Sequence, residues 1–68
     1  MSTEFKEGKV KFYNATKGYG FITTQDGKEI FVHVSGILPG NNIIQDQHVQ
    51  YREKQGKKGL NAVDVELI

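Results

Sequence analysis

The sequence contains no cysteine and no tryptophan, only one proline, and no long apolar run. Without cysteine the chain has no disulfide, no thiol nucleophile and no thiolate ligand for a metal, which fits a reducing compartment. The first seven residues lack the basic start and apolar core of a signal peptide, and no stretch approaches the roughly 18 apolar residues of a membrane span. We therefore expect a soluble, cytoplasmic protein that uses no membrane and no metal.

The size and net charge of the chain limit the number of domains and the class of binding partner. The chain has 68 residues, and nine lysines and arginines against eight acidic residues give a net charge of +1. This length predicts one domain with a small core, divided into an N-terminal tail over residues 1–7 and a folded part over residues 8–68. The net charge is too small to indicate a nucleic-acid-binding protein by itself. Positive charge is nevertheless concentrated in two places, one holding Lys9, Lys11 and Lys17 and the other Lys57 and Lys58.

Alternation of apolar and polar residues predicts strands and no helix. A turn at 25–28 contains Asp-Gly, a strong hairpin signal because glycine adopts positive φ easily. The connection over 35–47 shows no alternation, although Leu38, Ile43 and Ile44 are available to anchor it. The predicted strands cover residues 8–14, 18–24, 29–34, 48–54 and 60–67. Five short strands with one long connection favour an all-β fold, a five-stranded antiparallel Greek-key β-barrel, because closure removes the open sheet edges.

The same alternation separates an inner face from an outer face. We expect the inner face to hold mainly β-branched aliphatic residues, which fill a small barrel well. The predicted core is Val10, Ile22, Ile30, Val32, Val34, Val49, Tyr51, Val63, Val65 and Leu67. Gly18 and Gly20 share the inner parity, and they allow either barrel curvature or the close approach of a base.

The outer face of the second and third strands carries Tyr19, Phe21, Phe31 and His33. A single aromatic residue on a strand is more often buried than exposed. Inverting these two strands, however, would expose four aliphatic residues in exchange, which is costly for so small a protein. The aromatic residues are therefore surplus to the core and available for binding.

Aromatic rings flanked by lysines suit single-stranded nucleic acid, because rings stack on any base while ammonium groups meet phosphates. Stacking contributes about 1–3 kcal/mol per base, so three rings could outweigh a modest electrostatic attraction. A module that binds extended peptides with the same aromatic residues is the main alternative. Salt dependence separates the two hypotheses, since only phosphate binding releases counterions.

Catalysis is not indicated. His33 with Ser35, and His48 with Asp46, could be imagined as catalytic or metal-binding pairs. Neither pair has a third group to orient it, and two scattered histidines do not form a metal site. We therefore expect a protein that is not an enzyme and that needs no cofactor.

Two segments carry a family resemblance. The runs over residues 8–22 and 30–37 strongly resemble the bacterial cold-shock protein family. Within them, Lys-Gly-Tyr-Gly-Phe-Ile at 17–22 resembles the family's first ribonucleoprotein motif, and Ile-Phe-Val-His-Val at 30–34 resembles the second. The resemblance covers nearly the whole chain. It implies an OB-type barrel that binds single-stranded RNA and DNA and acts as an RNA chaperone in cold or other stress. A monomer is the default expectation. The residues matching the family's contact positions are Lys11, Phe12, Tyr19, Phe21, Phe31, His33 and Lys58, to which we add Lys17 from its place beside the aromatic residues.

Three departures from the family pattern predict weaker binding. Phe12 stands where the family commonly has tryptophan, Val34 stands where an aromatic residue usually follows the histidine, and the long connection contains no aromatic residue. Strict alternation also places Phe12 on the inner face with Val10, so its exposure requires a β-bulge or a bend.

Overall fold

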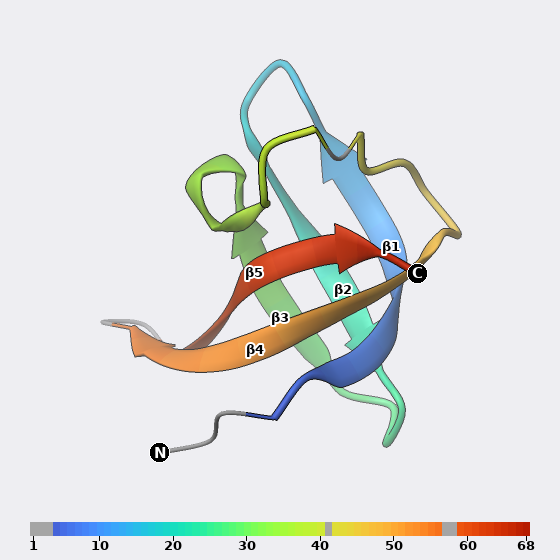
Figure 1. The fold of residues 1–68 in the computed structure, drawn as a ribbon, viewed down its shortest axis with the longest axis vertical. Coiled ribbons are helices and arrows are strands. Elements are labelled where there is room, and N and C mark those ends of the chain that lie inside the picture. The colour runs from blue at the N-terminus through green and yellow to red at the C-terminus, as the bar shows by residue number, and fades with distance from the viewer. Residues whose placement is uncertain (1–3, 41, 57–58) are drawn as a thin grey trace.

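The chain forms a closed barrel of five strands, seen in a computed structural model that describes residues 4–40, 42–56 and 59–68 (Figure 1). The strand order around the barrel is β1-β2-β3-β5-β4, so the last two strands are inverted relative to the chain, as in a Greek key. A single 3-10 turn, η1, follows β3. The bounds are Lys6–Asn14 for β1, Tyr19–Thr24 for β2, Glu29–His33 for β3, Val34–Gly36 for η1, His48–Gly56 for β4 and Gly59–Leu67 for β5.

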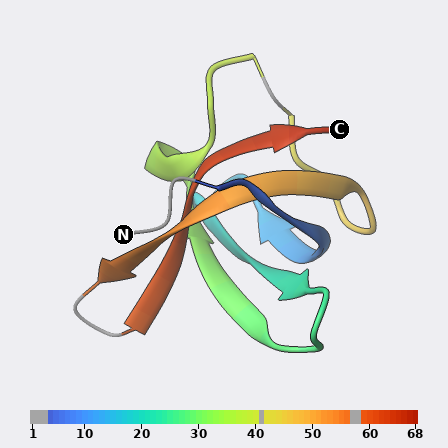
Figure 2. The same ribbon diagram turned by 60° about the horizontal axis from the view of Figure 1, so that its bottom comes forward.

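The predicted all-β, five-stranded barrel is confirmed. Four of the strand pairings are antiparallel, as expected, whereas β3 and β5 pair in parallel over Phe31 with Asn61 and Val32 with Ala62. Strand β1 begins at Lys6, two residues before the expected boundary of the folded part, because Lys6 pairs with Tyr51 on β4. The β4–β5 hairpin projects to one side beyond the barrel (Figure 2). Nothing helical within the described residues reaches the length and hydrophobicity of a membrane span.

The Asp-Gly turn joins β2 and β3 as the sequence predicts. Gly27 has φ of 86°, the positive value that glycine adopts without strain. The turn is closed by the Thr24 N–H, which donates to the Lys28 carbonyl at 2.7 Å. This tight connection places the outward side chains of β2 and β3 on one continuous surface.

Seven of the ten predicted core residues are buried, together with two that alternation did not select. The nine-residue core consists of Val10, Ile22, Ile30, Val32, Ile43, Val49, Tyr51, Ala62 and Val65. Ile43 comes from the long connection and confirms one of its three expected anchors, whereas Leu38 is only partly buried and Ile44 is 59% exposed. Ala62 comes from β5.

Val34, Val63 and Leu67 do not belong to the core. Strand β3 ends at His33, so Val34 begins η1 and is 50% exposed. In β5 the residue Asp64 has φ of 52°, and the register against β4 shifts between Gln50 and Arg52. Such an irregularity turns the residues that follow it toward the opposite face. Ala62 and Val65, three residues apart, therefore both face inward, and Val63 is not in the core. Leu67 has the parity of Val65 but is the last residue of β5 and is 37% exposed.

Candidate nucleic-acid interface

Four aromatic rings meet on the outer face of β1, β2 and β3. The strand register pairs Phe21 with Phe12 on one side and with Phe31 on the other, and it pairs Tyr19 with His33. The rings of Tyr19 and Phe31 are stacked at 5.9 Å, and those of Phe21 and Phe31 meet edge to face at 5.8 Å. We call the four rings of Phe12, Tyr19, Phe21 and Phe31 the aromatic platform.

Phe12 joins this platform because β1 is irregular. The pairing of β1 with β2 shifts between Val10 and Phe12, so that Val10 pairs with Ile22 but Phe12 pairs with Phe21. Val10 is fully buried and Phe12 is 39% exposed, although alternation assigns them to the same face. The Phe12 ring lies 5.9 Å from Tyr19 and 6.5 Å from Phe21. The bulge that the sequence required for Phe12 to be exposed is present.

Gly20 makes the close approach of β1 possible. A Cβ at this buried position would lie 2.2 Å from the carbonyl oxygen of Phe12 and 2.7 Å from the Cα of Tyr13. Backbone atoms cannot give way to such a contact, so only glycine fits. The space beside Gly20 is thus filled by β1. Of the two roles considered for this glycine, barrel geometry is the one that these contacts explain.

His33 is exposed at the end of β3 and has a defined orientation. Its Nδ1 accepts the backbone N–H of Ser35 at 3.1 Å and lies 2.9 Å from the Ser35 hydroxyl. Because Nδ1 accepts, the proton of the neutral ring is on Nε2, which stays available as a donor. No cluster of three or more metal-ligating side chains occurs in the described ranges.

The lysines predicted beside the platform differ in their surroundings. Lys11 is exposed and forms an ion pair with Glu29 of β3. Lys17 is exposed in the turn after β1, where its backbone N–H donates to Asn14 Oδ1 at 3.0 Å. Its ammonium group forms no ion pair within the described part of the chain. Lys58, the remaining predicted contact, lies outside the described residues together with Lys57.

Comparison with models of protein families assigns this barrel to a known family. The model of the 'Cold-shock' DNA-binding domain matches residues 6–68. The chain belongs to the cold-shock domain family. This match includes every residue of the aromatic platform and both strands that carry the recognised motifs.

Bacterial relatives of this cold-shock domain are similar over most of their length. Cold shock protein 2 of Lactiplantibacillus plantarum is 44% identical over 63 residues, covering 90% of this chain and 96% of the relative. The cold shock-like protein of Thermotoga maritima is 41% identical with the same coverage. Cold shock-like protein CspC of Escherichia coli K12 is 44% identical over 66 residues, covering 91% of this chain and 94% of the relative.

A solved structure confirms the fold independently of sequence. The Drosophila Unr structure described as CSD456 superposes with a TM-score of 0.79 at 16% identity, over 96% of this chain. The cold-shock domain spans only 27% of that larger chain. At this level of identity the comparison shows the barrel architecture and nothing further about binding.

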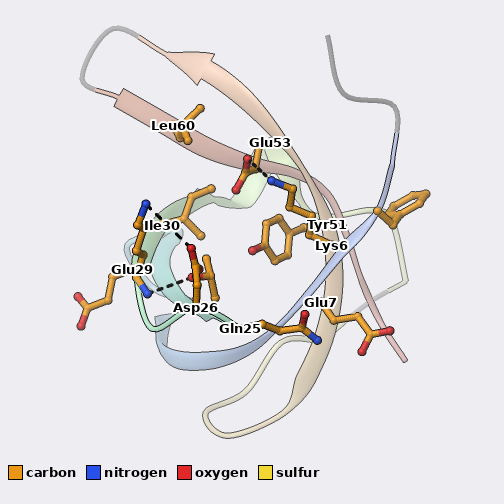
Figure 3. Close-up of a pocket in the computed structure, with 12 residues that line it drawn as sticks. Lys6, Glu7, Gln25, Asp26, Glu29, Ile30, Tyr51, Glu53 and Leu60 are labelled. Carbon is orange, nitrogen blue, oxygen red and sulfur yellow. Dashed lines mark hydrogen bonds and ion pairs between the residues drawn. The ribbon is translucent and has the colours of Figure 1, made fainter.

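A pocket of the cold-shock domain lies away from the platform rings, at one end of the barrel (Figure 3). It has a volume of about 590 Å³, and no platform ring lines it. Both lysines that line it are already paired, since Lys6 Nζ lies 2.9 Å from Glu53 and Lys28 Nζ lies 4.0 Å from Asp26. Burial, helped by the nearby carboxylates of Glu53 and Asp26, raises the pKa of Tyr51 above its usual value. The carboxylates that line this pocket disfavour the binding of a phosphate group there.

One residue on the platform face was not selected from the sequence. Glu29 shares the outward parity of Phe31, two residues later on β3, and its carboxylate contacts Lys11. Parity alone could have placed Glu29 beside the platform. Its partner could not be predicted, because the contact joins β3 to the irregular part of β1 across β2.

Proposed function

We propose that this cold-shock domain binds single-stranded RNA and single-stranded DNA through the aromatic platform and acts as a passive RNA chaperone in the response to cold or other stress. The observation that supports this best is the contact of four partly exposed rings on one face of a 68-residue chain whose core is filled by other residues. Continuous ring surface of this kind stacks unpaired bases without regard to their identity.

Each predicted contact residue has a distinct chemical role. The platform rings stack on bases, and His33 adds a further stack or donates a hydrogen bond from Nε2. Lysine ammonium groups neutralise phosphates and release counterions. The residues that we assign to phosphates are Lys11, Lys17 and Lys58.

The chaperone mechanism needs no catalysis. A strand whose bases are stacked on the platform cannot pair with itself at the same time, so binding shifts the equilibrium toward unpaired RNA by mass action. The protein then acts as a cytoplasmic monomer without cofactor or ATP, and release of the strand follows from competition and salt.

We expect the affinity to be lower than is usual for the family. Phe12 offers a smaller ring than tryptophan does, and Val34 presents an exposed aliphatic side chain where an aromatic residue would extend the stacking surface. The long connection contributes aliphatic residues only. Fewer bases should therefore be engaged, because each missing ring removes one stacking partner.

Fluorescence polarisation tests the proposal directly. A labelled short oligothymidine, its duplex and a proline-rich peptide would each be titrated at low and moderate salt. We expect saturable binding of the single strand, weakened by salt with a log–log slope of about −0.7 per neutralised phosphate, and little binding of the duplex or the peptide. Absence of single-strand binding at low salt would refute the proposal, and salt-independent peptide binding would favour a protein-binding module instead.

A further inference from the structure

Lys11 and Glu29 form an ion pair along one edge of the aromatic platform. Glu29 lies two residues before Phe31 on β3, and its cross-strand neighbour on β2 is Thr23. Thr23 in turn pairs with Lys9 on β1, so Lys11 approaches Glu29 from the far side of β2. The pair therefore crosses β2 beside the platform, at the end of the platform formed by Phe21 and Phe31.

This pair removes a positive charge where the proposed function needs one. Among the described residues, Lys17 carries an ammonium group without an ion-pair partner, whereas the Lys11 ammonium is in contact with a carboxylate. A phosphate arriving at Lys11 thus meets a lysine and a glutamate whose charges cancel. The side chains of Lys11 and Glu29 are 55% and 48% exposed, so the pair is weak enough to be opened by a competing anion.

We propose that Glu29 limits the affinity of this protein for single strands by competing with phosphate for the Lys11 ammonium. This inference rests on the proposed function. A bound strand has to displace the Glu29 carboxylate, which then stays beside the phosphate with its charge uncompensated. Two effects of Glu29 therefore act in the same direction, since the ion pair is lost and a like-charge contact is created.

The decisive experiment compares two Glu-to-Gln substitutions, one at Glu29 and one at Glu53. Glu29→Gln and Glu53→Gln change the net charge equally, and both remove the partner of a lysine. Glu53, however, lies on β4, which contributes no ring to the platform, and its partner Lys6 is at the start of β1. We expect Glu29→Gln to bind labelled oligothymidine about 1.5- to 5-fold more tightly at low salt, the range that corresponds to an exposed ion pair. Its log–log salt slope should steepen by about 0.7, because the charge of Lys11 is then no longer cancelled by a carboxylate beside the phosphate. Glu53→Gln should change neither quantity.

Lys11→Gln supplies the second arm. In the wild-type background this substitution should weaken binding, because it removes a phosphate contact and leaves the Glu29 carboxylate unpaired beside the strand. In the Glu29→Gln background it should abolish the gain in affinity and in salt slope. A gain of equal size in Glu29→Gln and Glu53→Gln would overturn the inference in favour of a long-range charge effect. Weaker binding by Glu29→Gln would also overturn it, because Glu29 would then be a favourable contact.

The same titrations separate this inference from the proposed function. If wild-type protein binds the oligonucleotide and Glu29→Gln binds it no more tightly, only the role of Glu29 fails. If neither protein binds the single strand at low salt, the nucleic-acid function itself fails and the inference fails with it. Thermal melting of each variant confirms that the folded protein is being compared.

Discussion

Replacing Phe31 by alanine separates a binding ring from a core ring. Phe31 belongs to the platform, and its ring contacts Tyr19 at 5.9 Å and Phe21 at 5.8 Å. If it stacks on a base, its loss should weaken binding by about 1–3 kcal/mol, which is about 5- to 150-fold in Kd. Fluorescence polarisation with labelled oligothymidine measures this change.

The stability of the same variant should change much less than its affinity. An aromatic pair contributes about 0.5–1.5 kcal/mol to stability beyond its buried area. Pairs of partly exposed rings are expected at the lower end of this range, so the loss of the two pairs that Phe31 forms should cost about 1 kcal/mol. In a chain of this size 1 kcal/mol lowers Tm by about 4–8 °C. Deleting a phenylalanine from a packed core would instead cost about 3–5 kcal/mol.

Phe5→Ala is the matched control for Phe31→Ala. Phe5 is 39% exposed, whereas Phe31 is partly buried, and the Phe5 ring lies 4.6 Å from the Arg52 guanidinium and contacts no platform ring. Its removal should leave Kd unchanged. The reasoning would be refuted if Phe31→Ala bound within twofold of wild type while remaining folded, or if Phe5→Ala weakened binding as strongly.

Three further substitutions test the geometry around this surface. V34F adds a ring at an exposed position next to the platform and should tighten oligothymidine binding, by at most the 1–3 kcal/mol of one stacked base; unchanged Kd would contradict this. Gly20→Ala forces a Cβ to 2.2 Å from the Phe12 carbonyl and should abolish cooperative melting, so a normal Tm would disprove the close packing. The Thr24 hydroxyl lowers the pKa of Asp26, a contribution to stability that is present above about pH 3.8 and lost as pH falls through the lowered value. Thr24→Val should therefore flatten the decline of Tm below pH 4, and an unaltered acid limb would show that this hydrogen bond contributes nothing.

Alternation was sufficient where the strands are regular. In β2 and β3 the sequence places Ile22, Ile30 and Val32 inside and Phe21 and Phe31 outside, and the structure has the same arrangement. These strands are joined by an Asp-Gly turn, and both flanking segments alternate between apolar and polar residues. Their register can therefore be predicted without information from the rest of the chain. The central part of the candidate site could therefore be predicted in full.

Alternation failed where pairing with a distant strand introduces an irregularity. Leu67 was expected inside and is exposed, while Ala62 was not selected and is buried. The burial of Ala62 in place of Val63 follows from the shifted register between β4 and β5 together with the left-handed backbone at Asp64. Leu67 keeps the parity of the buried Val65 but is the last residue of β5. A bulge reverses the face of every residue beyond it, and its position depends on contacts between strands, which a period of two does not contain.

The local order of residues was enough to determine the strands, the barrel and the outward rings of β2 and β3. The position of Phe12, the pairing of Lys11 with Glu29 and the burial of Ile43 were decided only when the barrel closed. The physical reason is that strand propensity and alternation act between neighbours in the chain, whereas a bulge, a cross-strand ion pair and an anchored loop each depend on which distant segment lies alongside.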